Sequence, residues 1–240
     1  MPLPFCRSER RLWRNYIEET LRGKNMRRGV FITFEGIDGC GKSFIQNMVY
    51  VWLTAEGYRV VSTLEPGGSE FGKAFRRMLL ESQYGSMDPQ TETLLFMVDR
   101  SRHVEEIIRP ALDAGDIVLC DRYIDSTIAY QGGGRGLNLD QLKTLNDFAI
   151  KGVRPDLTVY LAVTIAKATS RLSGKKDRLE QESVAFFQNV ADTYDSLAAE
   201  QPERITIIDG SGNPDQVFNL VKPEITRILT LNGVWPKGFD

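Results

Sequence analysis

FEGIDGCGKS, residues 34–43, is the stretch that decides the fold of this chain. The phosphate-loop motif G-x-x-x-x-G-K-[ST] is matched at every specified position by Gly36-Ile37-Asp38-Gly39-Cys40-Gly41-Lys42-Ser43. Its glycines let backbone N–H groups converge on phosphate oxygens, and the helix that follows adds its positive N-terminal end. We therefore expect Lys42 to reach the β- and γ-phosphates of a nucleotide, and the Ser43 hydroxyl to ligate Mg²⁺.

Short β-rich runs alternate with longer amphipathic stretches along the rest of the chain. This alternation is typical of βαβ units around a parallel sheet. We predict an α/β fold, a three-layer α/β/α P-loop NTPase with a five-stranded parallel sheet, with ligands bound beyond the carboxyl ends of the strands. The runs are Gly29–Phe34, Arg59–Leu64, Ile117–Cys120, Leu157–Leu161 and Arg204–Ile208.

The phosphate loop alone does not identify the reaction. Kinases, GTP switches and motor ATPases share it and differ in what receives the phosphate. The guanine-reading motif N-K-x-D is absent from the sequence, which argues against a GTP switch, and a motor ATPase would ordinarily be larger or form a ring. A small-molecule kinase needs a second phosphate-binding site and a mobile basic segment.

Composition narrows the class of protein further. The chain has 240 residues, 42% of them hydrophobic, and a formal net charge of −2, which suits one sizeable domain and gives no electrostatic case for nucleic acid or an anionic membrane. Since there is no signal-peptide pattern and no run of about 18 apolar residues, we expect a soluble protein. Three scattered cysteines, Cys6, Cys40 and Cys120, favour a reducing compartment. The one histidine, His103, almost excludes His-based triads and is expected to be a partly exposed polar residue.

Residues 1–28 differ from the rest of the chain, because basic residues dominate and the helical pattern is modest. We expect a non-catalytic extension, with an error in the assigned start codon as one explanation, since Met26 stands immediately before MRRGVFITFEG. An Arg-rich targeting or docking segment is the alternative, although its acidic residues and scarcity of serine weaken it.

Two arginines are candidates for the second phosphate site. Asp121 and Arg122 follow the third β-rich run, where Asp121 would hold Mg²⁺ through a water or orient Ser43, or alternatively cap the next helix. Arg122 would point into the same crevice. Phe96 and Arg100, four residues apart, share one helix face that offers an aromatic surface and a planar guanidinium for a base, although a phenylalanine there is more often core.

Two Gly-rich stretches border the same crevice. EPGGS, residues 65–69, ends the second run, and its turn brings backbone close to a ligand. STIAYQGGGRG, residues 126–136, places polar side chains on a short helix, where Tyr130 would close over a sugar and Thr127 or Gln131 would bond a base edge. A polar helix end followed by a flexible turn is the simpler interpretation.

The stretch SRLSGKKDRLEQES, residues 170–183, is polar and basic and lies between two helical patterns. Such a run is usually a solvated loop. In a P-loop protein it is also where a cis-acting arginine finger is expected, and its closure would exclude water. Its basic residues are Arg171, Lys175, Lys176 and Arg178.

The sequence resembles the bacterial thymidylate kinases from about Gly29 to about Leu231. The similarity is carried by FEGIDGCGKS, EPGGS, FMVDRSRH, DRYIDSTIAYQGGGRG and GKKDRLEQES, in the family's order and spacing. The resemblance implies a nucleoside monophosphate kinase domain over residues 29–240 with a lid at about 170–183. It also implies MgATP-dependent phosphorylation of dTMP to dTDP by a cytoplasmic homodimer, with no nucleic-acid or membrane partner.

The resemblance also assigns roles by motif position. The donor phosphates would be held by residues 36–44, with Asp38 near Mg²⁺ and the acceptor sugar, and Arg171 chief among the lid residues that stabilise the transferring phosphoryl. Catalysis would rest on Lys42, Asp38, Arg122 and Arg171, and the metal on Ser43, Asp121 and Asp38. The dTMP site would comprise Asp38, Glu65, Pro66, Phe96, Arg100, Arg122, Ser126, Thr127, Tyr130 and Gln131.

Three positions depart from the family pattern: Phe44 stands for a threonine, Leu64 for an arginine, and Ser173 for an arginine. Each loses a polar contact, so slower turnover or weaker ATP binding is expected. Two alternatives stay open. One is a kinase for another nucleoside monophosphate or for a deoxynucleoside, although a deoxynucleoside kinase would not need Arg122. The other is a non-catalytic nucleotide-sensing module.

Overall fold

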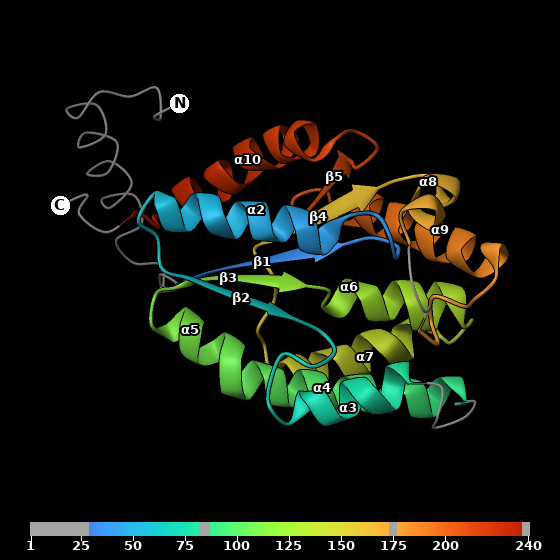
Figure 1. Cartoon of the computed structure of the whole chain (residues 1–240). Coiled ribbons are helices and arrows are strands. Elements are labelled where there is room, and N and C mark those ends of the chain that lie inside the picture. The colour runs from blue at the N-terminus through green and yellow to red at the C-terminus, as the bar shows by residue number, and fades with distance from the viewer. Residues whose placement is uncertain (1–28, 82–86, 173–176, 237–240) are drawn as a thin grey trace, which may run out of the picture.

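A computed structural model describes residues 29–81, 87–172 and 177–236 (Figure 1). The expectations for residues 1–28, and those for Ser173, Lys175 and Lys176, lie outside these described residues.

Five parallel strands form one sheet in the order β2-β3-β1-β4-β5. The central strand β1 is buried along its whole length, which explains its continuous apolar run. The α/β/α fold with a five-stranded parallel sheet is confirmed, and each expected strand boundary is correct to within one residue. The strands are β1 (Val30–Glu35), β2 (Val60–Leu64), β3 (Ile117–Asp121), β4 (Leu157–Ala162) and β5 (Ile205–Asp209).

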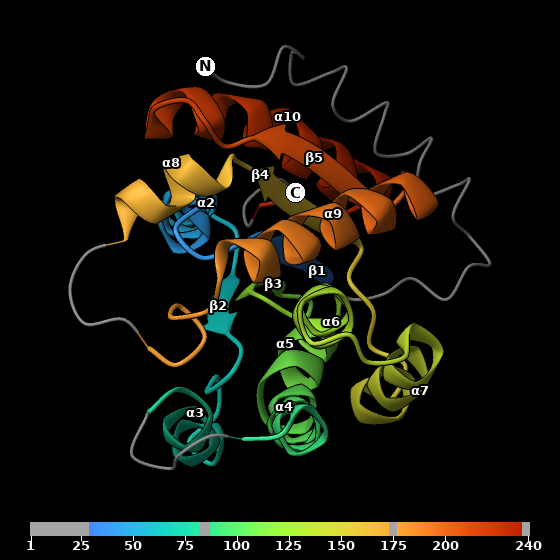
Figure 2. The same cartoon turned by 90° about the vertical axis from the view of Figure 1, so that its right-hand side faces the viewer.

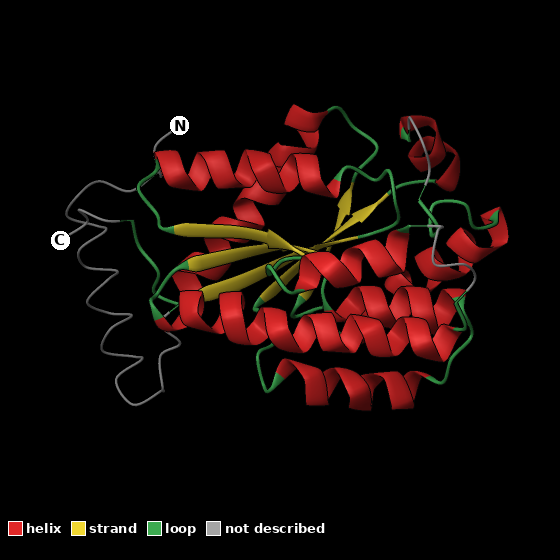
Figure 3. Ribbon diagram, turned by 60° about the horizontal axis from the view of Figure 1, so that its bottom comes forward, coloured by secondary structure: helices red, strands yellow, loops and turns green. Residues whose placement is uncertain are grey.

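Helices cover both faces of the sheet (Figure 2, Figure 3). Helices α2 and α10 pack together on one face, while α5 and α9 lie against the other. The helices are α2 (Lys42–Ala55), α3 (Gly72–Leu80), α4 (Pro89–His103), α5 (Arg109–Asp113), α6 (Ile124–Thr127), α7 (Leu139–Ile150), α8 (Ile165–Arg171), α9 (Val184–Glu200) and α10 (Pro214–Leu231), with π-helical segments η2 (Val104–Ile108) and η3 (Ile128–Gly134). Within the described residues, no helix combines the length and apolar composition needed to cross a membrane.

The carboxyl ends of three neighbouring strands position the chemistry. Strand β1 ends at Glu35 and leads into the phosphate loop, β2 ends at Leu64 and leads into the EPGGS turn, and β3 ends at Asp121. Because β2, β3 and β1 are adjacent and parallel, these three ends meet at one edge of the sheet. The sequence motifs that are far apart in the chain therefore meet in space.

Candidate active site

The phosphate loop connects β1 to α2 and ends at Gly41, whose φ of 102° is in the left-handed region. Among the described residues, no side chain caps the N-terminus of α2. Of the atoms of the described residues, only Arg171 Nη1, at 3.9 Å, would lie within 4 Å of a Cβ placed on Gly41, so these residues leave space where α2 begins. The first-turn N–H groups of α2 are thus arranged to receive an anion.

Lys42 lies over this loop. Its Nζ donates hydrogen bonds of 3.0 Å to the carbonyl oxygens of Gly36 and Ile37, and the side chain is buried. These bonds fix a cationic group directly against the phosphate loop, at the position expected for a residue that contacts the terminal phosphates of a donor.

Ser43 and Asp121 meet beside the loop, since Ser43 Oγ donates a hydrogen bond to Asp121 Oδ2. The second carboxylate oxygen, Oδ1, is buried and has no hydrogen-bond partner among the described residues. A buried carboxylate oxygen without a donor, next to a hydroxyl, fits a hard divalent cation such as Mg²⁺, which is bound by few protein oxygens plus phosphate oxygens and water. The part of the chain that the structure describes contains no group of three or more acidic, His or Cys side chains able to hold a metal.

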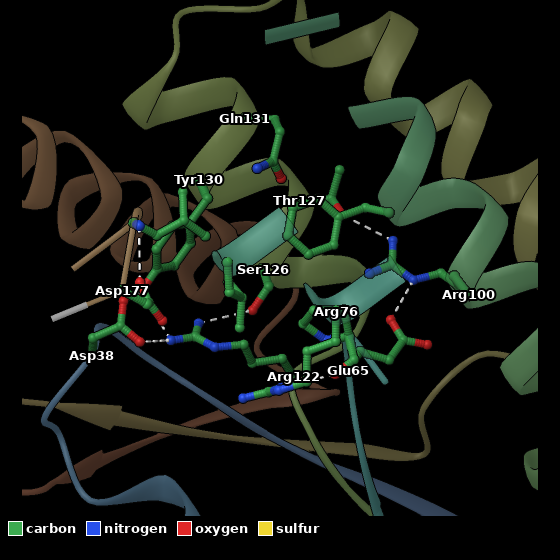
Figure 4. Close-up of a pocket in the computed structure, with 14 residues that line it drawn as sticks. Asp38, Glu65, Arg76, Arg100, Arg122, Ser126, Thr127, Tyr130, Gln131 and Asp177 are labelled. Carbon is green, nitrogen blue, oxygen red and sulfur yellow. Dashed lines mark hydrogen bonds and ion pairs between the residues drawn. The ribbon is translucent and has the colours of Figure 1, made fainter. Parts of the chain in front are cut away.

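A pocket lies at the same edge of the sheet, bordered by Asp38 of the phosphate loop, Glu65 after β2 and Arg122 after β3 (Figure 4). It holds about 570 Å³ of space, part of it open to solvent. All ten residues predicted for the dTMP site line this pocket. Four further residues of the lining, which the sequence did not single out, are Arg76, Leu80, Asp177 and Leu179. The lining comprises Asp38, Glu65, Pro66, Arg76, Leu80, Phe96, Arg100, Arg122, Ser126, Thr127, Tyr130, Gln131, Asp177 and Leu179.

Arg122 dominates the charge of this pocket. Its φ of 72° is unusual for a non-glycine residue and directs the side chain into the pocket instead of along the strand. Its guanidinium bonds to Asp38 Oδ1 at 2.5 Å, to the Tyr130 hydroxyl at 3.0 Å and to Ser126 Oγ at 3.2 Å. It also lies 4.7 Å from the centre of the Tyr130 ring. The neighbouring residues Asp121 and Arg122 thus serve two different sites.

Asp38 belongs to the pocket and not to the Ser43–Asp121 pair. Both of its carboxylate oxygens are engaged, one by Arg122 and the other by the Tyr130 hydroxyl at 2.8 Å. Burial would raise the pKa of Asp38, but the positive charges of Arg122 and Lys42 outweigh it and lower that pKa overall. Of the three residues predicted for the metal, the structure therefore brings together Ser43 and Asp121, while the Asp38 carboxylate is directed to Arg122.

Glu35 is a functional candidate that the sequence reasoning missed. It is fully buried at the end of β1 and accepts hydrogen bonds from the Tyr123 N–H (2.7 Å), Ser126 Oγ (2.6 Å) and the Tyr194 hydroxyl (2.8 Å). Burial, followed by the nearby Asp125, raises its pKa. Glu35 thus fixes the backbone at Tyr123, next to Arg122, and the Ser126 hydroxyl that Arg122 contacts. In the sequence, the one sign of this role is the position of Glu35 just before the phosphate loop.

Arg100 and Phe96 extend from α4 into the same pocket, as their shared helix face predicted. Arg100 is fully buried and donates to Glu65 Oε2 (2.8 Å) and Thr127 Oγ1 (2.9 Å). Gln131 lies in η3, and its Nε2 donates a hydrogen bond of 2.8 Å to Glu92 Oε1. The structure therefore places an aromatic ring, a guanidinium and two polar side chains around one end of the pocket.

His103 differs from the prediction of a partly exposed residue, because its exposed fraction is 0%. It lies at the end of α4, under the EPGGS turn, where a Cβ on Gly68 would lie only 2.4 Å from its Nε2. The helix pattern could not show that this turn folds back over the helix end.

Of the basic residues predicted for the lid, two are described. Arg171 donates to the carbonyl oxygens of Cys40 (3.1 Å) and Gly210 (3.0 Å), which puts it against the phosphate loop. Arg178 differs from expectation, because it lies 2.5 Å from the buried Glu92 carboxylate and donates to the Leu79 carbonyl oxygen. Its guanidinium is committed to α3 and α4 and is thus not arranged as a finger.

Fold and site together define a P-loop NTPase of the nucleoside monophosphate kinase type, with a phosphate loop and a cationic pocket that the loop borders through Asp38. A family model described as thymidylate kinase matches residues 34–221, so the chain belongs to the thymidylate kinase family.

Individual relatives agree over nearly their whole length. The chain is 39% identical over 210 residues to a thymidylate kinase from Bacillus pumilus, covering 86% of this chain and 99% of that protein. It is 42% identical over 220 residues to one from Desulfovibrio desulfuricans, covering 88% and 100%. A crystal structure of thymidylate kinase from Ehrlichia chaffeensis is 32% identical, with a TM-score of 0.70 over 82% of this chain and 98% of that one.

Asp99 supports the EPGGS turn and gives a testable pH dependence. Its carboxylate accepts from the Gly67 N–H at 3.1 Å, and burial, then Glu65, raises its pKa to about 6. Because this folded-state pKa is raised, the stability it contributes is present at low pH and is lost as pH rises through about 6. Between pH 4 and 7 we expect the wild-type free energy of unfolding to fall on the order of 2–3 kcal/mol relative to Asp99→Asn, in urea unfolding. A difference that stays constant with pH would contradict this pKa.

Proposed function

We propose that this protein transfers the γ-phosphoryl group of MgATP to the phosphate of dTMP, forming dTDP and ADP. An oxygen of the acceptor phosphate attacks the γ-phosphorus, and the bond from that phosphorus to the β–γ bridging oxygen breaks. The observation that carries the proposal is Arg122, a cation held by Asp38 and Ser126 in a pocket whose lining does not include the Ser43–Asp121 pair. The family membership of the chain supports the identity of both substrates.

On the donor side, the backbone of residues 36–44 and Lys42 hold the phosphates of ATP. Lys42 would exchange its bonds to Gly36 and Ile37 for phosphate oxygens, keeping its charge at the transferring group. Mg²⁺ would be held by Ser43 and by Asp121, whose Oδ1 lacks a donor among the described residues. When bound, the ion neutralises charge on the phosphates.

On the acceptor side, the dTMP phosphate binds Arg122 by displacing the Asp38 carboxylate that now occupies the guanidinium. Asp38 then lies next to the acceptor sugar, and Tyr130 packs against that sugar. Phe96 stacks on the thymine while Arg100 bonds to it, with Thr127 and Gln131 nearby and Ser126 supporting Arg122. Catalysis comes mainly from positioning and charge neutralisation, because phosphoryl transfer has a loose transition state.

The lid residue Arg171 stabilises the transferring phosphoryl group. Its present contacts with Cys40 and Gly210 keep it within reach of the phosphate loop. Arg178 instead anchors the second half of the lid, so that Asp177 and Leu179 form one wall of the pocket. Residues 29–240 form the catalytic domain in this proposal, and residues 1–28 are a non-catalytic extension.

The protein acts as a cytoplasmic homodimer in this proposal. Exposed apolar side chains on the adjacent helices α3 and α4 offer a face for a second copy, among them Met78, Leu94 and Val98.

Two residues that depart from the family pattern lack a polar group near the site. Phe44, which is 59% exposed and stands where the family has threonine, supplies no hydroxyl to a donor phosphate, and Leu64 supplies no cation beside EPGGS.

A coupled assay of ADP release with MgATP tests the reaction directly. With dTMP, dUMP, dCMP, AMP, GMP and thymidine as acceptors, we expect strong turnover with dTMP, weaker turnover with dUMP, and none with thymidine, which lacks the phosphate that Arg122 binds. One methyl group is worth about 1–3 kcal/mol in a pocket, so the preference over dUMP is expected to be modest. If ATP binds but no acceptor stimulates ADP release, the kinase proposal fails.

The variant Arg122→Ala separates the two sites. Loss of a charge-assisted hydrogen-bond partner is worth roughly 2–3 kcal/mol, so we expect the KM for dTMP to rise about 30- to 150-fold. The KM for ATP should change by less than about threefold, because Lys42 and the phosphate loop are untouched. Lys42→Ala is the matched control and should chiefly lower kcat. Equal increases of both KM values in Arg122→Ala would show that the acceptor role is misassigned.

A further inference from the structure

His103 is the only histidine of the chain, and both of its ring nitrogens are engaged in a fully buried position. Nδ1 lies 2.9 Å from Glu65 Oε1, and Nε2 lies 2.7 Å from Thr63 Oγ1. Since a carboxylate only accepts, Nδ1 carries a proton and donates to Glu65. Among the described residues that line the pocket is Glu65, the hydrogen-bond partner of His103 Nδ1.

Glu65 joins His103 to Arg100. One carboxylate oxygen accepts from His103, and the other accepts from Arg100 Nε at 2.8 Å. Both side chains come from α4, one turn apart, and Glu65 comes from the end of β2. The carboxylate is therefore fixed on both sides, in a buried site where the nearby Asp99 carboxylate repels it.

The orientation of Arg100 depends on where Glu65 holds it. Arg100 also donates to Thr127 Oγ1 (2.9 Å), to Asn146 Oδ1 and to the Tyr123 carbonyl oxygen (2.9 Å). A guanidinium has five N–H groups. Four are used by described residues, so one N–H of Nη2 has no partner among those residues, and Arg100 is one of the residues that line the pocket.

We propose that His103 is a positioning residue that holds Glu65 to a single hydrogen bond with Arg100, and thereby fixes the donor that Arg100 presents to the base. The inference rests on the proposed function, because it takes the base in the pocket to be thymine. Without a donor at Nδ1, Glu65 Oε1 would be buried and unpaired, which is unfavourable.

The Arg100 guanidinium, which already donates to Glu65 Oε2, is the neighbouring group that could donate to an unpaired Glu65 Oε1. Carboxylates pair with arginine in a bidentate arrangement, using Nε and one terminal nitrogen together. Glu65 would then draw Nη2 away from the Tyr123 carbonyl oxygen and toward itself, and the remaining N–H of Nη2 would be bonded to Glu65 instead of being available to a base. His103 prevents this by occupying Oε1.

This arrangement determines selectivity among pyrimidines. A fixed N–H donor favours a carbonyl oxygen on the base, which thymine and uracil present, over the amino group that cytosine presents at the corresponding position. Loss of the fixed donor should therefore weaken the preference for dTMP over dCMP, while ATP binding, which uses the phosphate loop and Lys42, stays unchanged.

Two substitutions separate the two nitrogens of the ring. In His103→Asn the side-chain amide nitrogen replaces Nδ1 and can still donate to Glu65, whereas in His103→Gln it replaces Nε2 and leaves Glu65 unpaired. For His103→Gln we expect the KM for dTMP to rise about tenfold and the dTMP/dCMP ratio of kcat/KM to fall about tenfold. For His103→Asn we expect both to stay within about threefold of the wild type, with the KM for ATP unchanged in both variants.

Equal selectivity in the two variants, or a rise in the KM for ATP that matches the rise for dTMP, would overturn the proposal. Should either variant fail to fold, ¹⁵N NMR of the unmodified protein decides, because a single histidine gives one set of imidazole signals. We expect a protonated Nδ1; an unprotonated Nδ1 could not donate to Glu65 and would overturn the proposal. Failure of the wild type to phosphorylate dTMP would instead refute the proposed function and leave the NMR result standing.

Discussion

The backbone of Arg122 is the constraint on which the site depends. A non-glycine residue with a φ of 72° stores on the order of 1–3 kcal/mol, so its surroundings must hold it there. The Arg122 N–H donates to the Phe34 carbonyl oxygen at 3.0 Å, and the next N–H donates to the Glu35 carboxylate at 2.7 Å. The end of β1 thus fixes the end of β3. As a result Asp121 reaches Ser43 while Arg122 turns into the acceptor pocket.

The buried charges of the pocket form carboxylate–arginine pairs, and in our proposal the arginine of each pair also binds dTMP. Asp38 occupies Arg122, and Glu65 occupies Arg100, at distances of 2.5 and 2.8 Å. Removing one partner of such a buried pair is strongly unfavourable, which keeps each guanidinium ionised and oriented. In our account the phosphate of dTMP replaces the Asp38 carboxylate as the anion bound to Arg122, so Arg122 always has an anionic partner. The Glu65–Arg100 pair remains intact.

The features predicted correctly from the sequence are those defined by residues close together in the chain. The phosphate loop, the strands that precede the motifs and the shared face of Phe96 and Arg100 depend on local spacing, and the structure has them in place. Residues defined by tertiary contacts were missed. Glu35 has no motif spacing to its partners Ser126 and Tyr194, which lie 91 and 159 positions away in the chain. The burial of His103, the pairing of Arg178 with Glu92 and the presence of Arg76 in the pocket likewise depend on how distant segments meet.

The central claim is that Arg122 recognises a phosphate on the acceptor, and equilibrium binding tests it without the rest of the reaction. Isothermal titration calorimetry of the unmodified protein with dTMP and with thymidine, in the absence of ATP, compares ligands that differ only in that phosphate. We expect dTMP to bind about 30-fold or more tightly, since a charge-assisted pair with arginine is worth roughly 2 kcal/mol or more. Equal affinities for dTMP and thymidine would contradict the account.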